Sequence, residues 1–238
     1  AEAFSRYQEA FDSLSSKPAV EVVPELRETL LAHYGARLTA AKRLDETVRV
    51  LTSPLARMGT GLTASLHFSL GLALLELKQF GEAADQMRQC LAKRGQRSLS
   101  PINRDILTAA PHHCLAVSLA NLGKAAEAEK SFQAGLKELD HVDALRLDYA
   151  RFLFEQKRAV DALHPLNEIV AHDPRNVMAW RLGGQIALSS SEFLEFARDW
   201  TTEAMSHVPD DVIVLTQRAE VLMLSEDTAT ARTLWEKL

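Results

Sequence analysis

The sequence predicts an all-α fold in which antiparallel helix pairs stack on one another as an α-solenoid. First, a small residue recurs near the start of a helix at Ala128, Ala162, Ala197 and Ala231, with separations of 34 (162 − 128), 35 (197 − 162) and 34 (231 − 197). Second, each interval holds two helix-length segments, as a repeat of helix pairs requires. Third, apolar residues make up 47% of the chain and aromatic residues 6%, which favours helices packed through Ala and Leu over a β-sandwich.

Composition also limits the partners and the compartment. The net charge of −5 leaves no broad basic face, which argues against nucleic acid as a partner. No apolar run approaches the roughly 20 residues that cross a bilayer, so membrane insertion is not predicted. Cys90 and Cys114 fit neither a metal spacing nor a disulfide framework. A cytoplasmic location is the default expectation, although a mature periplasmic domain would look the same.

The amino-terminal region, residues 1–61, is predicted to form degenerate helices of the same repeat. Residues 1–14 have the spacing of a second helix, and residues 21–38 have the pattern of a first helix. In the next predicted helix, residues 41–51, Thr47 stands where a small Ala is expected. We therefore expect a pair that is irregular but still helical.

Residues 62–238 are predicted to form the regular array, with one insertion. The interval from Ala83 to Ala128 is 45 (128 − 83), about 11 residues longer than the repeat. The extra residues fall around 94–108, where we expect either a loop at one edge of the stack or a short helix over residues 102–108.

Later pairs keep the period to the end of the chain. The predicted helices cover residues 111–121, 125–139, 142–156, 159–172 and 177–188. A further helix is predicted to end before Pro209, and the last unit begins at residue 212. Gly183 and Gly184 fall inside one of these helices. Each Gly weakens a helix by about 0.5–1 kcal/mol relative to Ala, so we expect a neighbouring helix to approach closely there.

Several positions that recur in phase resemble the tetratricopeptide repeat consensus. The matching residues are Leu66-x-x-x-Leu70-Gly71-x-x-Leu74, Trp180-x-x-x-Gly184, the pairs Ala128/Phe132 and Ala231/Trp235, and the closing Pro174 and Pro209. The resemblance covers residues 28–238 and is weakest before residue 62. It implies a right-handed superhelix whose first helices line a concave groove, and a role in holding peptides or segments of partner proteins.

The family register places groove residues at the second, fifth, ninth and twelfth positions of each first helix. On this chain the resemblance selects Phe68, Leu72, His113, Val117, Asn121, Leu147, Arg151, Phe154, Arg181, Gln185, Thr216 and Glu220, with Asp148 beside Leu147. Several of these side chains donate hydrogen bonds that suit carboxylates or peptide carbonyls. The alternative is that they are ordinary solvated or packed residues. Some family members clamp a carboxyl terminus with Lys and Asn at the fifth and ninth positions, and this chain lacks that pair.

No catalytic or metal-binding pattern stands out. His112, His113 and Cys114 are consecutive, and successive side chains of a helix point about 100° apart, so they do not converge on one metal ion. The sequence has no Gly-rich phosphate loop, nucleophile elbow or paired-Cys motif. We therefore predict a protein that is not an enzyme and that uses no cofactor or metal.

Two classes of function fit these observations. In the first, the protein is an interaction scaffold whose groove holds a peptide or a partner-protein segment. In the second, it is an accessory domain of a larger enzyme or bacterial envelope assembly protein, as in arrays attached to glycosyltransferases, and also mediates oligomerisation. No polar capping helix follows Trp235, so we expect a truncated final repeat or self-association through that uncapped end.

Overall fold

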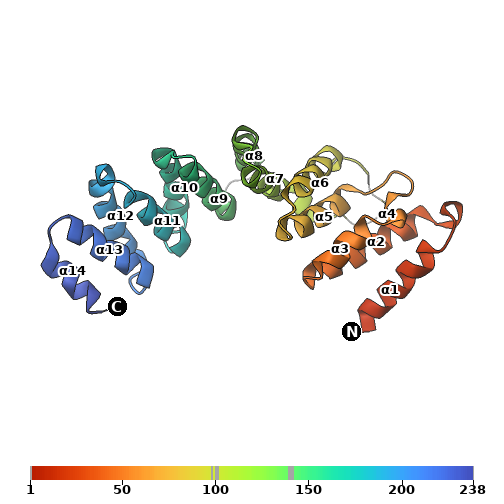
Figure 1. Cartoon of the computed structure of the whole chain (residues 1–238), viewed down its shortest axis with the longest axis horizontal. Coiled ribbons are helices and arrows are strands. Elements are labelled where there is room, and N and C mark those ends of the chain that lie inside the picture. Colours follow the sequence, from red (N-terminus) through yellow and green to blue (C-terminus); the bar gives the residue numbers. More distant parts are fainter. Residues whose placement is uncertain (1, 98, 100–101, 139–141, 238) are drawn as a thin grey trace. The chain divides into compact units, whose positions relative to one another are not determined.

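The computed structural model describes residues 2–97, 99, 102–138 and 142–237, and every regular element within them is a helix (Figure 1). The chain divides into two compact units, Ala1–Asp140 and His141–Leu238. The boundary that we predict after residue 61 concerns the regularity of the repeats and stays a prediction. None of the helices in the described ranges combines the length and apolar character that a membrane crossing needs.

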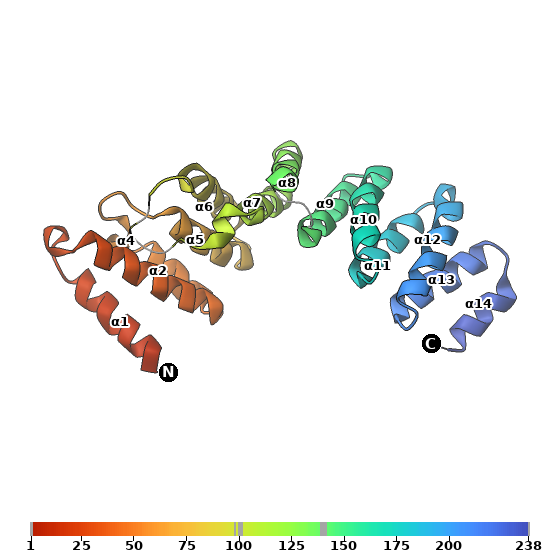
Figure 2. The same ribbon diagram turned by 180° about the vertical axis from the view of Figure 1, so that it is seen from behind.

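In its described residues, unit 1 has a leading helix, three antiparallel helix pairs and a one-turn helix (Figure 2). These are α1 (Glu2–Ser15), α2 (Pro24–Ala40) with α3 (Leu44–Leu51), α4 (Pro54–Arg57), α5 (Ala64–Glu76) with α6 (Phe80–Lys93), and α7 (Ala110–Asn121) with α8 (Ala125–Glu138). The insertion contains a short 3-10 helix, Arg104–Leu107, whose Ile106 is buried. We expected either a loop or a short helix in this segment, and the observed 3-10 helix is closer to the second expectation.

Unit 2 consists of three pairs in its described residues. They are α9 (Asp143–Glu155) with α10 (Ala159–His172), α11 (Val177–Ala187) with α12 (Leu194–His207), and α13 (Val212–Leu224) with α14 (Thr228–Trp235). Within each unit, the second helix of a pair also packs on the first helix of the next pair. The predicted all-α stack of antiparallel helix pairs is therefore confirmed in each unit.

The first and second helices of most pairs are joined by one kind of turn. Its middle residue has a φ between 58° and 72°, and these residues are Lys42, Lys78, Gly123, Lys157 and Glu226. The next amide donates a hydrogen bond to the carbonyl of a Leu five positions earlier, as at 3.0 Å from Arg158 to Leu153. This is the hydrogen bond of a Schellman motif that spans more residues, the 6→1 bond, and with it the chain reverses so that the second helix runs back along the first.

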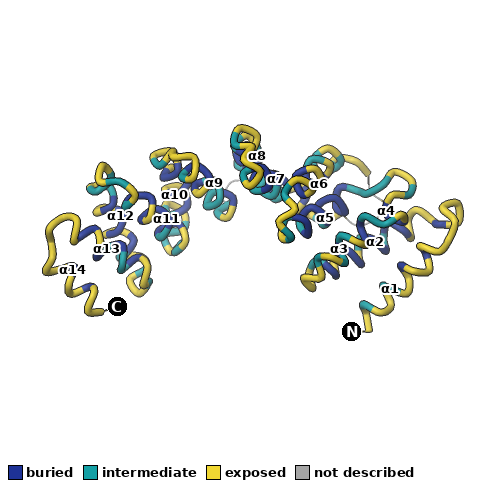
Figure 3. Tube along the Cα trace, viewed as in Figure 1, coloured by how far each residue is buried: buried dark blue, intermediate teal, exposed yellow. Residues whose placement is uncertain are grey.

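The recurring small residues lie at the helix crossings, as predicted. Ala128, Ala162, Ala197 and Ala231 are all 0% exposed. Buried and exposed residues alternate along the helices (Figure 3), as expected where one side of each helix packs on its neighbours. A small side chain at these places lets the two helices approach closely, so that the larger apolar residues around it pack against both.

Enlarging one of these crossing residues is expected to destabilise the fold. The change Ala162→Leu inserts a branched side chain at a fully buried site and should lower the free energy of unfolding by about 1–3 kcal/mol. Ala171 is exposed on the same helix, so Ala171→Leu should change the free energy of unfolding by less than about 0.5 kcal/mol. Urea unfolding of the two variants checks this, and equal losses would contradict the assigned register.

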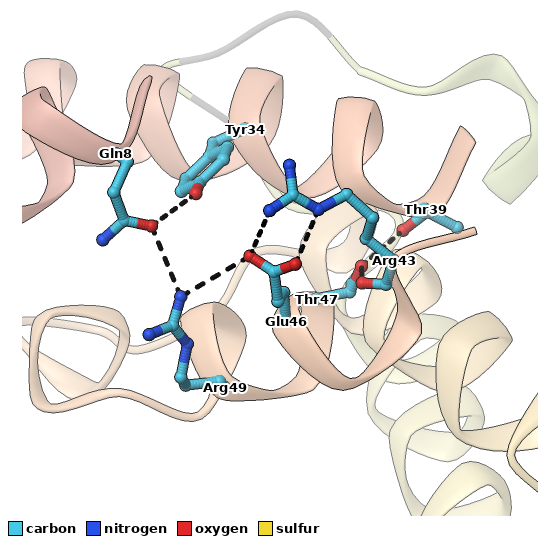
Figure 4. A network of polar contacts seen from close by, with 7 residues as sticks. All are labelled: Gln8, Tyr34, Thr39, Arg43, Glu46, Thr47 and Arg49. Carbon is cyan, nitrogen blue, oxygen red and sulfur yellow. Dashed lines mark hydrogen bonds and ion pairs between the residues drawn. The ribbon is translucent and has the colours of Figure 1, made fainter. Parts of the chain in front are cut away.

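The degenerate first pair packs despite its irregular sequence. Thr47 is fully buried where α3 packs on α2, and its hydroxyl donates a hydrogen bond to the Arg43 carbonyl at 3.1 Å, so this buried polar group has a partner. A polar network supports this region (Figure 4): the Gln8 Oε1 atom accepts hydrogen bonds from the Tyr34 hydroxyl at 2.7 Å and from Arg49 Nη2 at 3.3 Å. The network ties α1 to both α2 and α3.

Candidate interaction surface

Each first helix of unit 2 presents one exposed face. In α11, Met178, Arg181, Gln185 and the following Leu188 are spaced by three or four residues and therefore share a helical face. Trp180 lies on the other side of α11, where it is fully buried against α12. The α11 face is thus left uncovered because the packing of the pair uses the opposite side.

The same positions recur in the neighbouring first helices. They are Ala144, Leu147, Arg151 and Phe154 in α9, and Ile213, Thr216, Glu220 and Met223 in α13. All of these residues, and those of α11, are exposed or partly exposed. Because α9 contacts α11 and α11 contacts α13, their faces lie side by side. We call this set of residues the first-helix face of unit 2.

Two apolar rows flank a polar row on the first-helix face. Met178 is 49% exposed and Ile213 44% exposed at the second position, and Met223 is 50% exposed at the twelfth. Gln185 and Glu220 lie between them at the ninth position and are exposed. Met178, Ile213 and Met223 are absent from the residues selected from the sequence, although the family register itself points to their positions.

Arg181 joins two first helices within this face. Its Nε atom donates a hydrogen bond to Asp211 Oδ1 at 3.0 Å, and its Nη2 atom donates to Asp211 Oδ2. Asp211 also caps α13 by accepting from the Val214 amide at 3.1 Å. The Arg181 guanidinium, with a smaller contribution from the Val214 amide, holds the pKa of the Asp211 carboxyl below its usual value. Arg181 therefore fixes α11 to α13, and only part of its guanidinium faces solvent.

The Arg151 guanidinium is held along its own helix. Its Nη1 atom donates to Asp148 Oδ1 at 2.8 Å, and the Arg151 side chain is 50% exposed. An exposed ion pair of this kind adds little stability, about 0.5 kcal/mol or less. The pair mainly sets where the Arg151 charge lies on the first-helix face.

Phe154 lies at the edge of the first-helix face and lines a cleft of about 460 Å³. Phe193 lines the same cleft, together with Val160, which is 67% exposed. The cleft lies between the turn after α9 and the turn after α11, where Lys157 and Glu192 add charges of opposite sign. The cleft therefore has apolar side chains in its lining and charged side chains at its rim.

The insertion of unit 1 covers part of the corresponding face there. The Asn103 amide donates to Ser65 Oγ at 3.0 Å, at the second position of α5. Phe68, at the fifth position, is 3% exposed. Phe68 is therefore unavailable to a ligand in this structure, in contrast to its selection from the sequence.

Other residues selected in unit 1 are accessible to different degrees. Leu72, His113 and Val117 are partly exposed, and Asn121 is exposed. The Asn121 side chain donates to the Val117 carbonyl at 2.9 Å, so it bonds within its own helix. A role for these residues in ligand binding stays a prediction.

A polar cluster that the sequence did not indicate joins α6, α7 and α8. Glu138 accepts a hydrogen bond from Arg94 at 3.1 Å and lies 3.4 Å from His112 Nε2. The Arg94 guanidinium lowers the pKa of Glu138, and burial lowers the pKa of His112, which favours neutral imidazole at pH 7. The cluster links consecutive helix pairs.

The cysteines have the environment of packing residues. Burial raises the pKa of Cys90 to about 11 and that of Cys114 to about 12, so both thiols stay protonated near neutral pH, where a thiol is a weak nucleophile. In the described part of the chain, no three His, Cys, Asp or Glu side chains are grouped to hold a metal ion.

The comparisons with known proteins agree on the class of fold. Residues 119–186 match the tetratricopeptide repeat family model. No curated protein sequence matches the chain. The match at residues 119–186 confirms the resemblance to this family that the sequence indicated.

Solved structures of tetratricopeptide proteins share this fold over most of their length. YrrB, described as having an unusual peptide-binding site, is 15% identical with a TM-score of 0.61, over 79% of this chain and 90% of that one. MamA from Desulfovibrio magneticus RS-1 is 20% identical with a TM-score of 0.58, over 75% and 94%. The C-terminal part of a repeat protein from Cytophaga hutchinsonii is 13% identical with a TM-score of 0.71, over 87% and 77%. At these identities the likeness concerns the fold alone.

Proposed function

We propose that the protein is a non-catalytic interaction scaffold and that the first-helix face of unit 2 binds an extended segment of a partner protein. The observation that carries the proposal is the pattern of Met178, Ile213 and Met223, large apolar side chains that stay exposed around a polar centre. Isolated exposed apolar residues are common, but aligned rows on one face are typical of binding surfaces. The peptide-binding site described for YrrB, which shares the fold, agrees with this proposal.

The geometry favours a particular kind of segment. The second and twelfth positions are ten residues apart on a helix, about 15 Å, so a single extended chain fits between the two apolar rows. Successive side chains of an extended chain point to opposite sides, toward one row and then the other. The Gln185 side-chain amide has no hydrogen-bond partner in the described residues and can bond the backbone of such a segment. We therefore expect partners with bulky apolar residues in an extended stretch.

Peptide selection followed by substitution tests this proposal. Peptides selected from a random library on the immobilised chain should bind the double variant Met178→Gln, Met223→Gln about tenfold more weakly, because two exposed apolar contacts are lost. Leu107→Gln is the matched control, since Leu107 is 59% exposed on the insertion and lies outside the first-helix face of unit 2. Fluorescence polarisation measures the affinities. Equal affinities for the double variant and the control would refute the proposal.

A further inference from the structure

The insertion of unit 1 encloses a cavity of about 220 Å³ against the start of α5 and the end of α6. Its lining includes the large apolar side chains of Leu62, Leu99, Ile102 and Ile106. It also includes the polar side chains of Lys93, Thr63 and Arg97. Pockets for drug-sized ligands begin near about 300 Å³, so this cavity suits a smaller molecule with one apolar and one polar end.

Lys93 is held in place at the cavity by neutral partners. Its Nζ atom donates to the Leu62 carbonyl at 2.9 Å and lies 3.3 Å from His67 Nε2. His67 Nδ1 lies 2.7 Å from Gln86 Oε1, so Nδ1 carries the proton and Nε2 accepts from Lys93. Burial, and then the Lys93 charge, lower the pKa of His67. Within the described residues, the Lys93 ammonium therefore has a fixed position and no carboxylate to neutralise it.

Thr63 provides a hydroxyl without a partner. It occupies the capping position of α5, yet its side chain makes no capping bond. Its Oγ1 atom is buried and has no hydrogen-bond partner. A buried hydroxyl without a partner is unfavourable, and a ligand that accepts a hydrogen bond would remove that penalty.

Among the described residues of the lining, the cations Lys93, Arg94 and Arg97 outnumber the carboxylate of Glu28, so the cavity has a positive balance of charge. Glu28 accepts the Leu99 amide at 2.9 Å and so supports the insertion backbone. Arg94 is neutralised by Glu138, as described above. Arg97 is exposed and makes no ion pair in the described part of the chain, so its charge adds to that of Lys93.

We propose that this cavity binds a small organic anion, a short-chain carboxylate. The carboxylate oxygens accept hydrogen bonds from Lys93, Thr63 and Arg97, because charge-assisted bonds of this kind are strong. The hydrocarbon part lies against Leu62, Ile102 and Ile106. The site does not depend on partner binding to unit 2, so each proposal can fail without the other.

Titration with small molecules tests the class of ligand. Sodium 4-methylpentanoate, added at constant ionic strength, should produce saturable shifts in amide resonances of the residues that line the cavity. The neutral 4-methylpentanamide lacks the charge, and inorganic phosphate lacks the apolar part, so each should bind at least about tenfold more weakly. No saturable shift with the carboxylate, or equal binding of either comparison molecule, would overturn the proposal.

Substitutions then test the site itself. Thr63→Val should weaken carboxylate binding about tenfold without lowering Tm, because it removes a hydroxyl that has no partner in the fold. Arg97→Gln should weaken binding by a factor of about three or more. Arg104→Gln is its control, since Arg104 is exposed on the same insertion but does not line the cavity. Equal weakening by Arg97→Gln and Arg104→Gln, or a Thr63→Val variant with unchanged affinity, would place the ligand elsewhere.

Discussion

Replacing Trp180 with Ala is expected to lower the free energy of unfolding by about 3–5 kcal/mol, the range for removing a buried Trp. Trp180 is fully buried in α11, and its ring centroid lies 4.6 Å from that of Trp200 in an edge-to-face arrangement. Its Nε1 atom donates to the Pro174 carbonyl at 2.8 Å, so the change also removes a hydrogen bond from the loop before α11. Urea unfolding, followed by the helical circular dichroism signal, measures the loss.

Trp235→Ala is the matched control. Trp235 is 44% exposed at the end of α14, and its truncation should cost less than about 1 kcal/mol. Comparable losses for the two Trp variants would mean that Trp180 does not occupy the centre of unit 2.

Gly183→Ala is expected to cost about 3 kcal/mol, at the upper end for overpacking. A Cβ atom on Gly183 would collide with the Trp200 indole, a rigid ring that is itself packed against Trp180 and Phe196. Ala favours a helix by about 0.5–1 kcal/mol over Gly, so the collision must outweigh that gain.

Gly81→Ala, in the first turn of α6, is expected to stabilise the fold, whereas Gly183→Ala destabilises it. Beyond the neighbouring residues and backbone of its own helix turn, no described atom lies within 4 Å of a Cβ built on Gly81, so the variant should gain about 0.5 kcal/mol from helix propensity. Thermal unfolding of both Gly variants checks the pair. A Gly183→Ala variant as stable as Gly81→Ala would show that α12 does not approach α11 as described.

The repeat was predictable from the sequence because its physical requirement recurs. A close helix crossing accepts only a small side chain, so Ala162 and its equivalents mark the period. The double Gly indicated a close approach, and the structure identifies the approaching groups as Trp200 and Gln217. Those partners come from later helices, and no local pattern names them.

The turns were predictable only in part. Gly123 marks one turn, since Gly readily adopts a positive φ. Lys78 and Lys157 adopt the same conformation without any sequence signal. There the hydrogen bond back to the first helix and the packing of the pair hold a conformation that Lys rarely adopts.

The candidate surface was predictable as a face but not in its contacts. The register selects the exposed sides of α9, α11 and α13 because exposure follows the helical period. The Arg181–Asp211 pair joins residues 30 positions apart, and the Asn103–Ser65 hydrogen bond joins α5 to an insertion with no repeat pattern. Both depend on how separate helices meet, which a single sequence does not encode in any short motif.

Photo-crosslinking tests the central claim, that partners bind on the first-helix face of unit 2. A benzophenone-bearing residue at position 185, exposed on α11, should crosslink to a selected peptide, and excess unlabelled peptide should prevent the crosslink. The same residue at position 167, exposed on the second helix α10, should give no crosslink. Crosslinking at position 167 but not at position 185 would contradict the account.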